Sequence, residues 1–212
     1  AAPRWRRPSI TGMGTALAAM LKALGAEPVH AAGHSAGAAI LLRMALDGQI
    51  APKHVVSLNG ALLPFPGVAA HLFPSLAKIL FLNPVAPRFF SWRARNTRAV
   101  AQLMESTGSR ISPQGIAYYE RLFSSKAHVE GALSMMANWD LEGLRRDLPR
   151  LAVPLTLVVG TKDRAIPPDV SERVARMVKD AKVETLPGLG HLAHEEAPER
   201  VGEVLLRALT QG

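Results

Sequence analysis

The stretch AAGHSAGAAI, residues 31–40, decides how the rest of the chain is interpreted. Its centre is the pattern Gly-x-Ser-x-Gly at residues 33–37, between a predicted strand at 28–32 and a predicted helix at 38–46. A strand-to-helix turn that projects the hydroxyl of Ser35 is sharp and strained, so only glycine or similarly small residues fit around it. A Gly/Ala-rich helix start without chemistry is the alternative, but the strand, turn and helix context favours a nucleophile.

Short apolar runs alternate with helical patterns along most of the chain. The predicted helices cover residues 11–24, 38–46, 169–179 and 198–209, and the predicted strands cover residues 28–32, 54–60, 155–160 and 182–187. Such alternation is typical of a parallel sheet whose faces are covered by helices. The sequence therefore predicts an α/β fold with a mostly parallel sheet flanked by helices.

Residues 61–150 interrupt this alternation. Five prolines between residues 64 and 87 divide an apolar stretch into short pieces, and helical patterns follow, one of them opened by the cap and first-turn pair Ser112-Pro113. We therefore expect three parts. Residues 1–60 and 151–212 form the two halves of a sheet core, and residues 61–150 form a helical insertion.

A nucleophilic serine needs a base that accepts its proton and an acid that orients the base. Functional groups of open parallel sheets collect in the loops after the carboxyl ends of the strands. Asp163 follows the predicted strand 155–160, and His191 follows the predicted strand 182–187. Each alone reads as an ordinary turn or loop residue, but the order serine, acid, histidine matches this architecture and favours a catalytic triad.

Two other histidines compete for the role of base. His194 lies nearer the start of the last predicted helix, where capping and loop support suit it better, so His191 is preferred. His34 is expected to point away from Ser35 and to form a wall of the pocket. A metal site made of His191, His194 and Glu195 lacks a second ligand pair at suitable spacing, so we expect no metal and no cofactor.

The composition is that of a globular protein: 48% of the 212 residues are apolar and 20% are charged. The 25 Lys and Arg outnumber the 17 Asp and Glu, and the formal net charge of +8 favours anionic small molecules or an acidic membrane surface as partners. No nucleic-acid module surrounds the basic groups, so nucleic acid is not an expected partner. Cysteine is absent, which excludes disulfides and thiolate metal sites. No run approaches the ~20 apolar residues of a transmembrane helix.

These residues give the chain a resemblance to the α/β-hydrolase superfamily over nearly its whole length. The matching segments are GHSAG, GTKDRAIPP and GLGHLAHEEAPERV. The resemblance implies the hydrolase fold, with residues 61–150 as a helical lid over the substrate pocket. It also implies Ser35 as the nucleophile, Asp163 as the orienting acid and His191 as the general base. The backbone N–H of Ala36 would be one donor of the oxyanion hole.

A narrower resemblance is to the magnesium-chelatase accessory subgroup of bacteriochlorophyll synthesis. It rests on GHSAGAAILLRMALDG, SLNGALLPFPG, STGSRISPQGIAYYERLF and GALSMMANWDL. It implies an ester or tetrapyrrole as the small-molecule substrate, magnesium chelatase as a partner, and a location in the cytoplasm or at the surface of the photosynthetic membrane. A macrocycle with two propionates suits a lid carrying Arg88, Arg93, Arg95 and Arg98, although snorkelling from a lid helix explains the same arginines.

The segment before Ser35 departs from the superfamily pattern. In the superfamily several strands and a His-Gly loop precede the nucleophile, and that loop supplies the second oxyanion donor. Only one predicted helix and one predicted strand precede Ser35 here, so we expect a fragment that lacks the N-terminal strands; losing one such donor costs ~10²–10³ in rate. Three functions stay open: a serine hydrolase of a pathway ester, a non-catalytic tetrapyrrole-binding helper, and a generic carboxylesterase.

Overall fold

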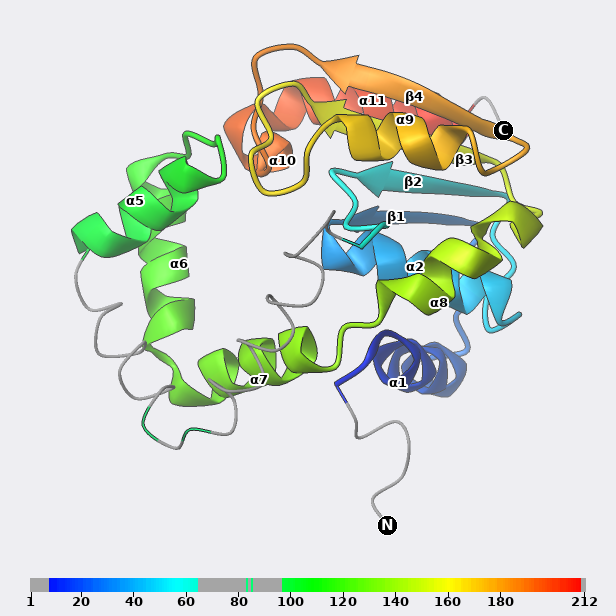
Figure 1. The fold of residues 1–212 in the computed structure, drawn as a ribbon, viewed down its shortest axis with the longest axis horizontal. Coiled ribbons are helices and arrows are strands. Elements are labelled where there is room, and N and C mark those ends of the chain that lie inside the picture. Colours follow the sequence, from blue (N-terminus) through cyan, green and yellow to red (C-terminus); the bar gives the residue numbers. More distant parts are fainter. Residues whose placement is uncertain (1–7, 65–82, 84, 86–96, 211–212) are drawn as a thin grey trace.

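The computed structural model describes residues 8–64, 83, 85 and 97–210, and its centre is a four-stranded parallel sheet in the order β1-β2-β3-β4 (Figure 1). The strands are β1 (His30–His34), β2 (His54–Leu58), β3 (Leu155–Gly160) and β4 (Ala181–Leu186). Every residue of β2 and β3 is buried, as expected for central strands of a parallel sheet covered on both faces. The predicted parallel α/β fold is confirmed.

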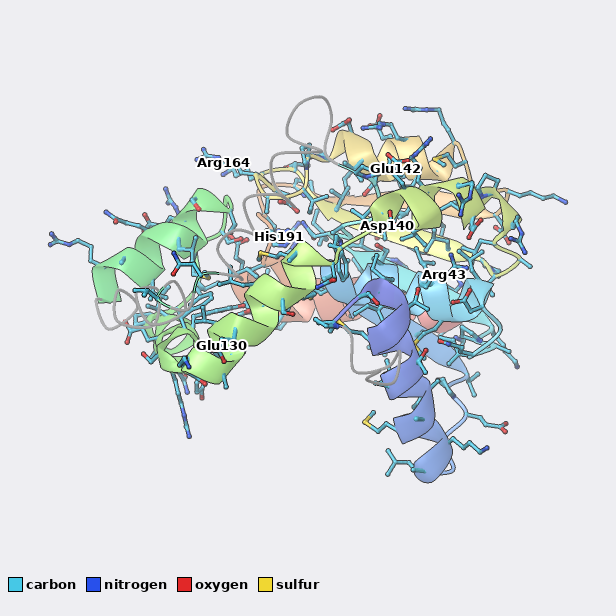
Figure 2. The ribbon with its side chains drawn as sticks, turned by 60° about the horizontal axis from the view of Figure 1, so that its bottom comes forward. Arg43, Glu130, Asp140, Glu142, Arg164 and His191 are labelled. Atoms are coloured by element: carbon cyan, nitrogen blue, oxygen red, sulfur yellow. The ribbon has the colours of Figure 1, made fainter. Side chains whose placement is uncertain are left out.

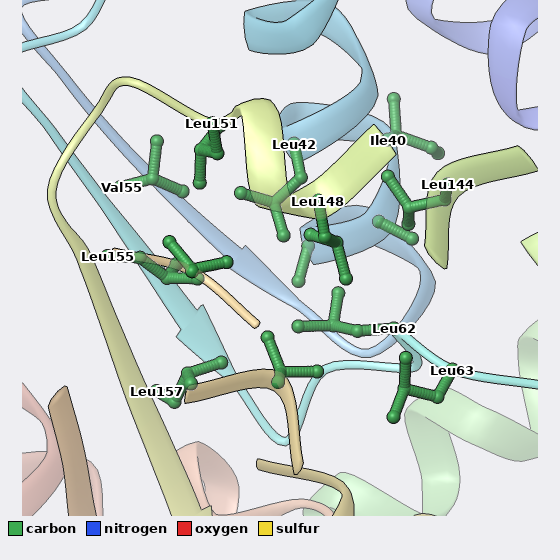
Figure 3. Packing of buried hydrophobic residues seen from close by; sticks show 14 of the residues in the cluster. Ile40, Leu42, Val55, Leu62, Leu63, Leu144, Leu148, Leu151, Leu155 and Leu157 are labelled. Carbon is green, nitrogen blue, oxygen red and sulfur yellow. The ribbon is translucent and has the colours of Figure 1, made fainter. Parts of the chain in front are cut away.

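Helices cover both faces of this sheet, and further helices lie beyond the carboxyl ends of its strands. They are α1 (Ile10–Ala23), α2 (Ala36–Leu46), α5 (Thr97–Ser106), α6 (Pro113–Ser124), α7 (Lys126–Ala137), α8 (Leu141–Asp147), the 3₁₀ turn η2 (Leu148–Arg150), α9 (Asp169–Ala175), α10 (Ala193–Glu196) and α11 (Pro198–Thr210). Side chains from α2, α8, η2 and α9 form the main core with Val55 and Leu155 (Figure 3). Those from α10 and α11 form a second core with Val56 and Val158. Successive strand residues face opposite sides, so β2 and β3 serve both cores.

The predicted elements are present, with ends that differ by a few residues. The predicted strand 28–32 is displaced, because β1 begins at His30 and continues to the residue before Ser35. Ser112 caps α6, and its Oγ accepts a hydrogen bond from the N–H of Gly115 at 3.1 Å. The short helix α10 was not predicted, since four residues are too few to give a helical pattern.

The predicted insertion supplies helices α5 to α7, which lie beyond the carboxyl ends of the strands (Figure 1). Its residues 65–82 and 86–96 lie outside the described residues. Helix α8 and η2 also fall in the predicted insertion, but Leu144 and Leu148 are fully buried in the main core beside α2 (Figure 3). Within the described part of the chain, no helix has the length and apolar character needed to cross a membrane.

Candidate active site

The turn between β1 and α2 holds Ser35 in a conformation that few non-glycine residues adopt, with φ 51° and ψ −118°. The N–H of Ser35 donates to the carbonyl of Leu58 at 3.0 Å, and its own carbonyl accepts from the N–H of Ala38 at 3.2 Å. A Cβ on Gly33 would lie 2.7 Å from the backbone nitrogen of Ala38, so α2 can start this close to β1 only above a glycine. The surrounding backbone thus fixes the strained serine.

Ser35, His191 and Asp163 form a continuous chain of hydrogen bonds at the carboxyl ends of the strands. Nε2 of His191 lies 3.0 Å from Oγ of Ser35, and Nδ1 lies 2.8 Å from Oδ2 of Asp163. Figure 2 shows His191 on the side of the sheet that faces helices α5 to α7. A carboxylate only accepts hydrogen bonds, so Nδ1 carries the proton and Nε2 turns its lone pair to the serine hydroxyl. The structure brings together the three residues expected from the sequence.

The carboxylate of Asp163 is fully buried and has four donors around it. The N–H groups of Ala165 and Ile166 both donate to Oδ1 at 2.8 Å. Oδ2 accepts from His191 and from the side-chain amide of Asn59 at 2.6 Å. These donors satisfy the buried oxygens and fix which of them faces the imidazole.

Asn59 is a component of the site that the sequence did not single out. It follows β2 with φ 48°, is 1% exposed, and donates to the carbonyl of Gly190 at 3.2 Å as well as to Asp163. The available signal was the pair Asn59-Gly60 directly after a buried strand, since asparagine tolerates positive φ. Asn59 therefore joins the loop of the acid to the loop of the histidine.

His34 packs against the base and does not face the serine in any described contact. Its Nε2 donates to the backbone carbonyl of His191 at 2.8 Å, and the two rings lie 4.8 Å apart. Burial lowers the pKa of His34 to about 4; its hydrogen bond to His191 opposes this fall, and the nearby His191 and His194 add to it. A neutral His34 is therefore the form present at neutral pH, and it holds the backbone of His191.

His194, the competing base, lies on α10 with its ring 4.5 Å from that of His34. Its Nε2 is 3.8 Å from Oε1 of Glu195, and burial lowers its pKa. His191 is thus the histidine that faces Ser35. Across the described ranges, no group of three or more His, Asp or Glu side chains is placed to hold a metal ion.

The remaining predicted site residues fall in two groups. Ala36 is the first residue of α2, so its N–H is among the donors that a helix start leaves without an intrahelical partner. Arg88, Arg93 and Arg95 lie outside the described residues. Arg98 is described, and its side chain is exposed on α5.

With this geometry in place, comparison with known proteins gives the family. The sequence profile described as "Alpha/beta hydrolase family" matches residues 5–204. The chain belongs to the alpha/beta hydrolase family. This agrees with the sheet, the strained serine turn and the hydrogen-bonded triad geometry.

The chain is similar in sequence to several proteins and similar in fold to solved structures. The chain is 41% identical over 187 residues to the "Magnesium-chelatase 30 kDa subunit" of Rhodobacter capsulatus. The aligned region covers 86% of this chain and 63% of that protein. It is 23% identical to a 2-hydroxy-6-oxononadienedioate/2-hydroxy-6-oxononatrienedioate hydrolase of a Pseudomonas species, over 89% of this chain and 65% of that one. The esterase EaEST of Exiguobacterium antarcticum superposes with a TM-score of 0.75 at 16% identity, over 99% of this chain and 76% of the other. The chain thus spans less than two thirds of the length of the magnesium-chelatase relative.

Proposed function

We propose that the protein is a serine hydrolase that cleaves an ester or similar acyl compound. The observation that carries this proposal is the hydrogen-bond chain from Ser35 through His191 to Asp163, at 3.0 and 2.8 Å. Nucleophile and base at this distance, with the base oriented by a buried acid, are the arrangement that activates a serine hydroxyl.

The proposed reaction proceeds in two steps. Oγ of Ser35 attacks the substrate carbonyl while Nε2 of His191 takes its proton, and the N–H of Ala36 donates to the developing oxyanion. The imidazolium returns the proton to the leaving alcohol, and an acyl-serine remains. Water then attacks the acyl-serine with His191 again as base, which releases the acid and restores Ser35. Asp163 holds the imidazole throughout both steps.

We place this hydrolase in tetrapyrrole synthesis, because a relative that is 41% identical is named as a magnesium-chelatase subunit. The substrate would then be an ester of a pathway tetrapyrrole, and magnesium chelatase would be a partner. The net charge of +8 suits a substrate with propionate groups. We propose that the protein acts in the cytoplasm or at the surface of the photosynthetic membrane.

A fluorophosphonate probe tests the nucleophile. We expect the probe to label the wild-type chain at Ser35 and the Ser112→Ala variant at the same rate, because Ser112 is an exposed helix cap. Ser35→Ala should abolish labelling, and His191→Ala should slow it by at least about 10³-fold, as loss of a triad base does elsewhere. Mass spectrometry of the labelled peptide identifies the site. Absence of labelling, or labelling that persists in Ser35→Ala, would refute the hydrolase.

The chelatase relative also favours a second candidate, a helper that binds a tetrapyrrole and leaves the triad unused. This candidate predicts that porphyrin fluorescence changes on mixing with micromolar protein and that Ser35→Ala binds equally well. Neutralising Arg88, Arg93, Arg95 and Arg98 together should weaken the binding. Unchanged porphyrin spectra with the wild-type chain would exclude this helper function.

A further inference from the structure

The loop that carries His191 is held through its backbone N–H groups. Three consecutive N–H groups, those of residues 190–192, donate to acceptors outside the loop. The N–H of Gly190 donates to Oε1 of Glu196 at 2.7 Å, and that of His191 donates to the carbonyl of Thr107 at 3.4 Å. The N–H of Leu192 donates to Oγ of Ser109 at 2.8 Å. Two of the three acceptors therefore belong to the helical insertion.

The third acceptor is also tied to the insertion. Glu196 uses its other oxygen, Oε2, to accept from the backbone N–H of Arg110 at 3.1 Å. The segment 107–110, which we name the clasp, thus contacts residues 190–192 of the histidine loop and Glu196 on α10. Ser109 is 1% exposed, so its hydroxyl is a built part of this contact.

The clasp also holds the loop of the acid. The carbonyl of Thr107 accepts from the N–H of Arg164, next to Asp163, at 3.0 Å. Gly108 has φ 86°, and a Cβ there would collide with the carbonyl of Lys162. A Cβ on Gly190 would in turn collide with the backbone of Gly108. The three backbones are therefore in direct contact, with no side chain between them to absorb a displacement.

We infer that the clasp positions the catalytic base, so that Ser109 and Glu196 are positioning residues for the hydrolase. The inference rests on the proposed function and adds a role for the insertion, which sets the distance between His191 and Ser35. Neither residue touches the reacting atoms. Each acts by fixing the backbone from which the imidazole projects, and a displacement of about 1 Å at such a group can cost ~10² in rate.

The first test compares two serine-to-alanine variants of the same insertion. Ser109→Ala removes the acceptor of the buried N–H of Leu192, whereas Ser112→Ala removes the exposed cap of α6. We expect Ser109→Ala to slow fluorophosphonate labelling of Ser35 about 10- to 100-fold, and Ser112→Ala to leave it unchanged. Labelling of both variants is measured well below their melting temperatures. A wild-type rate in folded Ser109→Ala would refute the inference.

The second test compares two glutamate-to-glutamine variants, and it applies even if Ser109→Ala does not fold. Glu196→Gln keeps the size of the side chain but leaves one carbonyl oxygen to serve two N–H donors, Gly190 and Arg110. Glu203→Gln removes the same charge from the exposed side of α11. We expect a slower labelling rate only in Glu196→Gln. Equal rates in the two variants would refute a positioning role for Glu196.

Proton NMR separates the inference from the proposed function. The Nδ1 proton of His191, hydrogen-bonded to buried Asp163, should give a downfield resonance whether or not Ser35 is reactive. Displacement of the loop should shift or broaden this resonance in Ser109→Ala and Glu196→Gln, and not in their controls. If wild-type Ser35 is never labelled but the resonance responds, the hydrolase fails and the positioning role stands. If the resonance is unchanged in both variants, the positioning role fails.

Discussion

At the scale of single residues, the acceptors around His191 decide its chemistry. The carboxylate of Asp163 requires a proton on Nδ1, which leaves Nε2 free to accept from Ser35. The carbonyl of His191 is held by His34, so the ring and its backbone are both fixed. In the proposed hydrolase, a base held in this way loses little entropy when it takes the serine proton, so the site is preorganised for that transfer.

Asn59 gives a prediction at this scale. Asn59→Asp places a second carboxylate 2.6 Å from Oδ2 of Asp163, and two carboxylates at that distance cannot both stay charged. The folded variant therefore has to take up a proton, so it should be destabilised by about 1–3 kcal/mol at pH 7.5 and by less at pH 5. Urea unfolding at the two pH values measures this difference. Asn138→Asp, an exposed control on the cap of α7, should show no such dependence.

At the scale of elements, the positions where the strands end decided which site residues could be predicted from the sequence. Asp163 and His191 were predictable because each follows a strand, β3 or β4, and parallel strands end at the same edge of the sheet. Asn59 also follows a strand, but nothing near it in sequence indicates its partner Asp163, 104 residues away. Ser109 follows no strand, and its role depends on a partner 83 residues away. The end of a strand can be predicted from the residues around it, whereas contacts between distant residues form only when the segments pack together.

Helix α8 and η2 supply the prediction at this scale. Leu148 is 0% exposed in the main core, although it falls in the insertion expected from the sequence. Leu148→Ala should destabilise the whole chain by about 2–5 kcal/mol, because it leaves a cavity beside α2. Leu206→Ala, which truncates a side chain 66% exposed on α11, should change stability by less than about 0.5 kcal/mol. Thermal unfolding followed by circular dichroism compares them; equal melting temperatures would place η2 outside the cooperative core.

At the scale of the whole molecule, the candidate active site adds to the pairing of β2 with β3 in joining the two halves of the sheet core. The clasp, the loop of the acid and the loop of the histidine meet there through backbone contacts. His34 adds a contact from the first half of the chain to the last, and His194 packs on it. Changes in charge within this cluster should therefore act on global stability as well as on the proposed hydrolysis.

Burial lowers the pKa of three histidines, His34, His54 and His194. For His34 the pKa falls from 6.5 to about 4, so between these values the unfolded chain binds more protons than the folded chain. Stability from the neutral imidazole is therefore complete above pH 6.5 and is lost as the pH falls towards 4. We expect the free energy of unfolding to drop by about 2 kcal/mol or more between pH 7 and pH 4.5.

The variant His34→Gln measures how much of this loss of stability at low pH comes from protonation of His34. Its amide can still donate to the carbonyl of His191 but does not titrate, so its stability should fall less steeply between pH 6.5 and 4 than that of the wild type. His128→Gln, on the exposed surface of α7, should leave the slope unchanged. Urea unfolding at half-unit pH steps gives both slopes. Parallel curves for His34→Gln and the wild type would mean that protonation of His34 does not oppose folding.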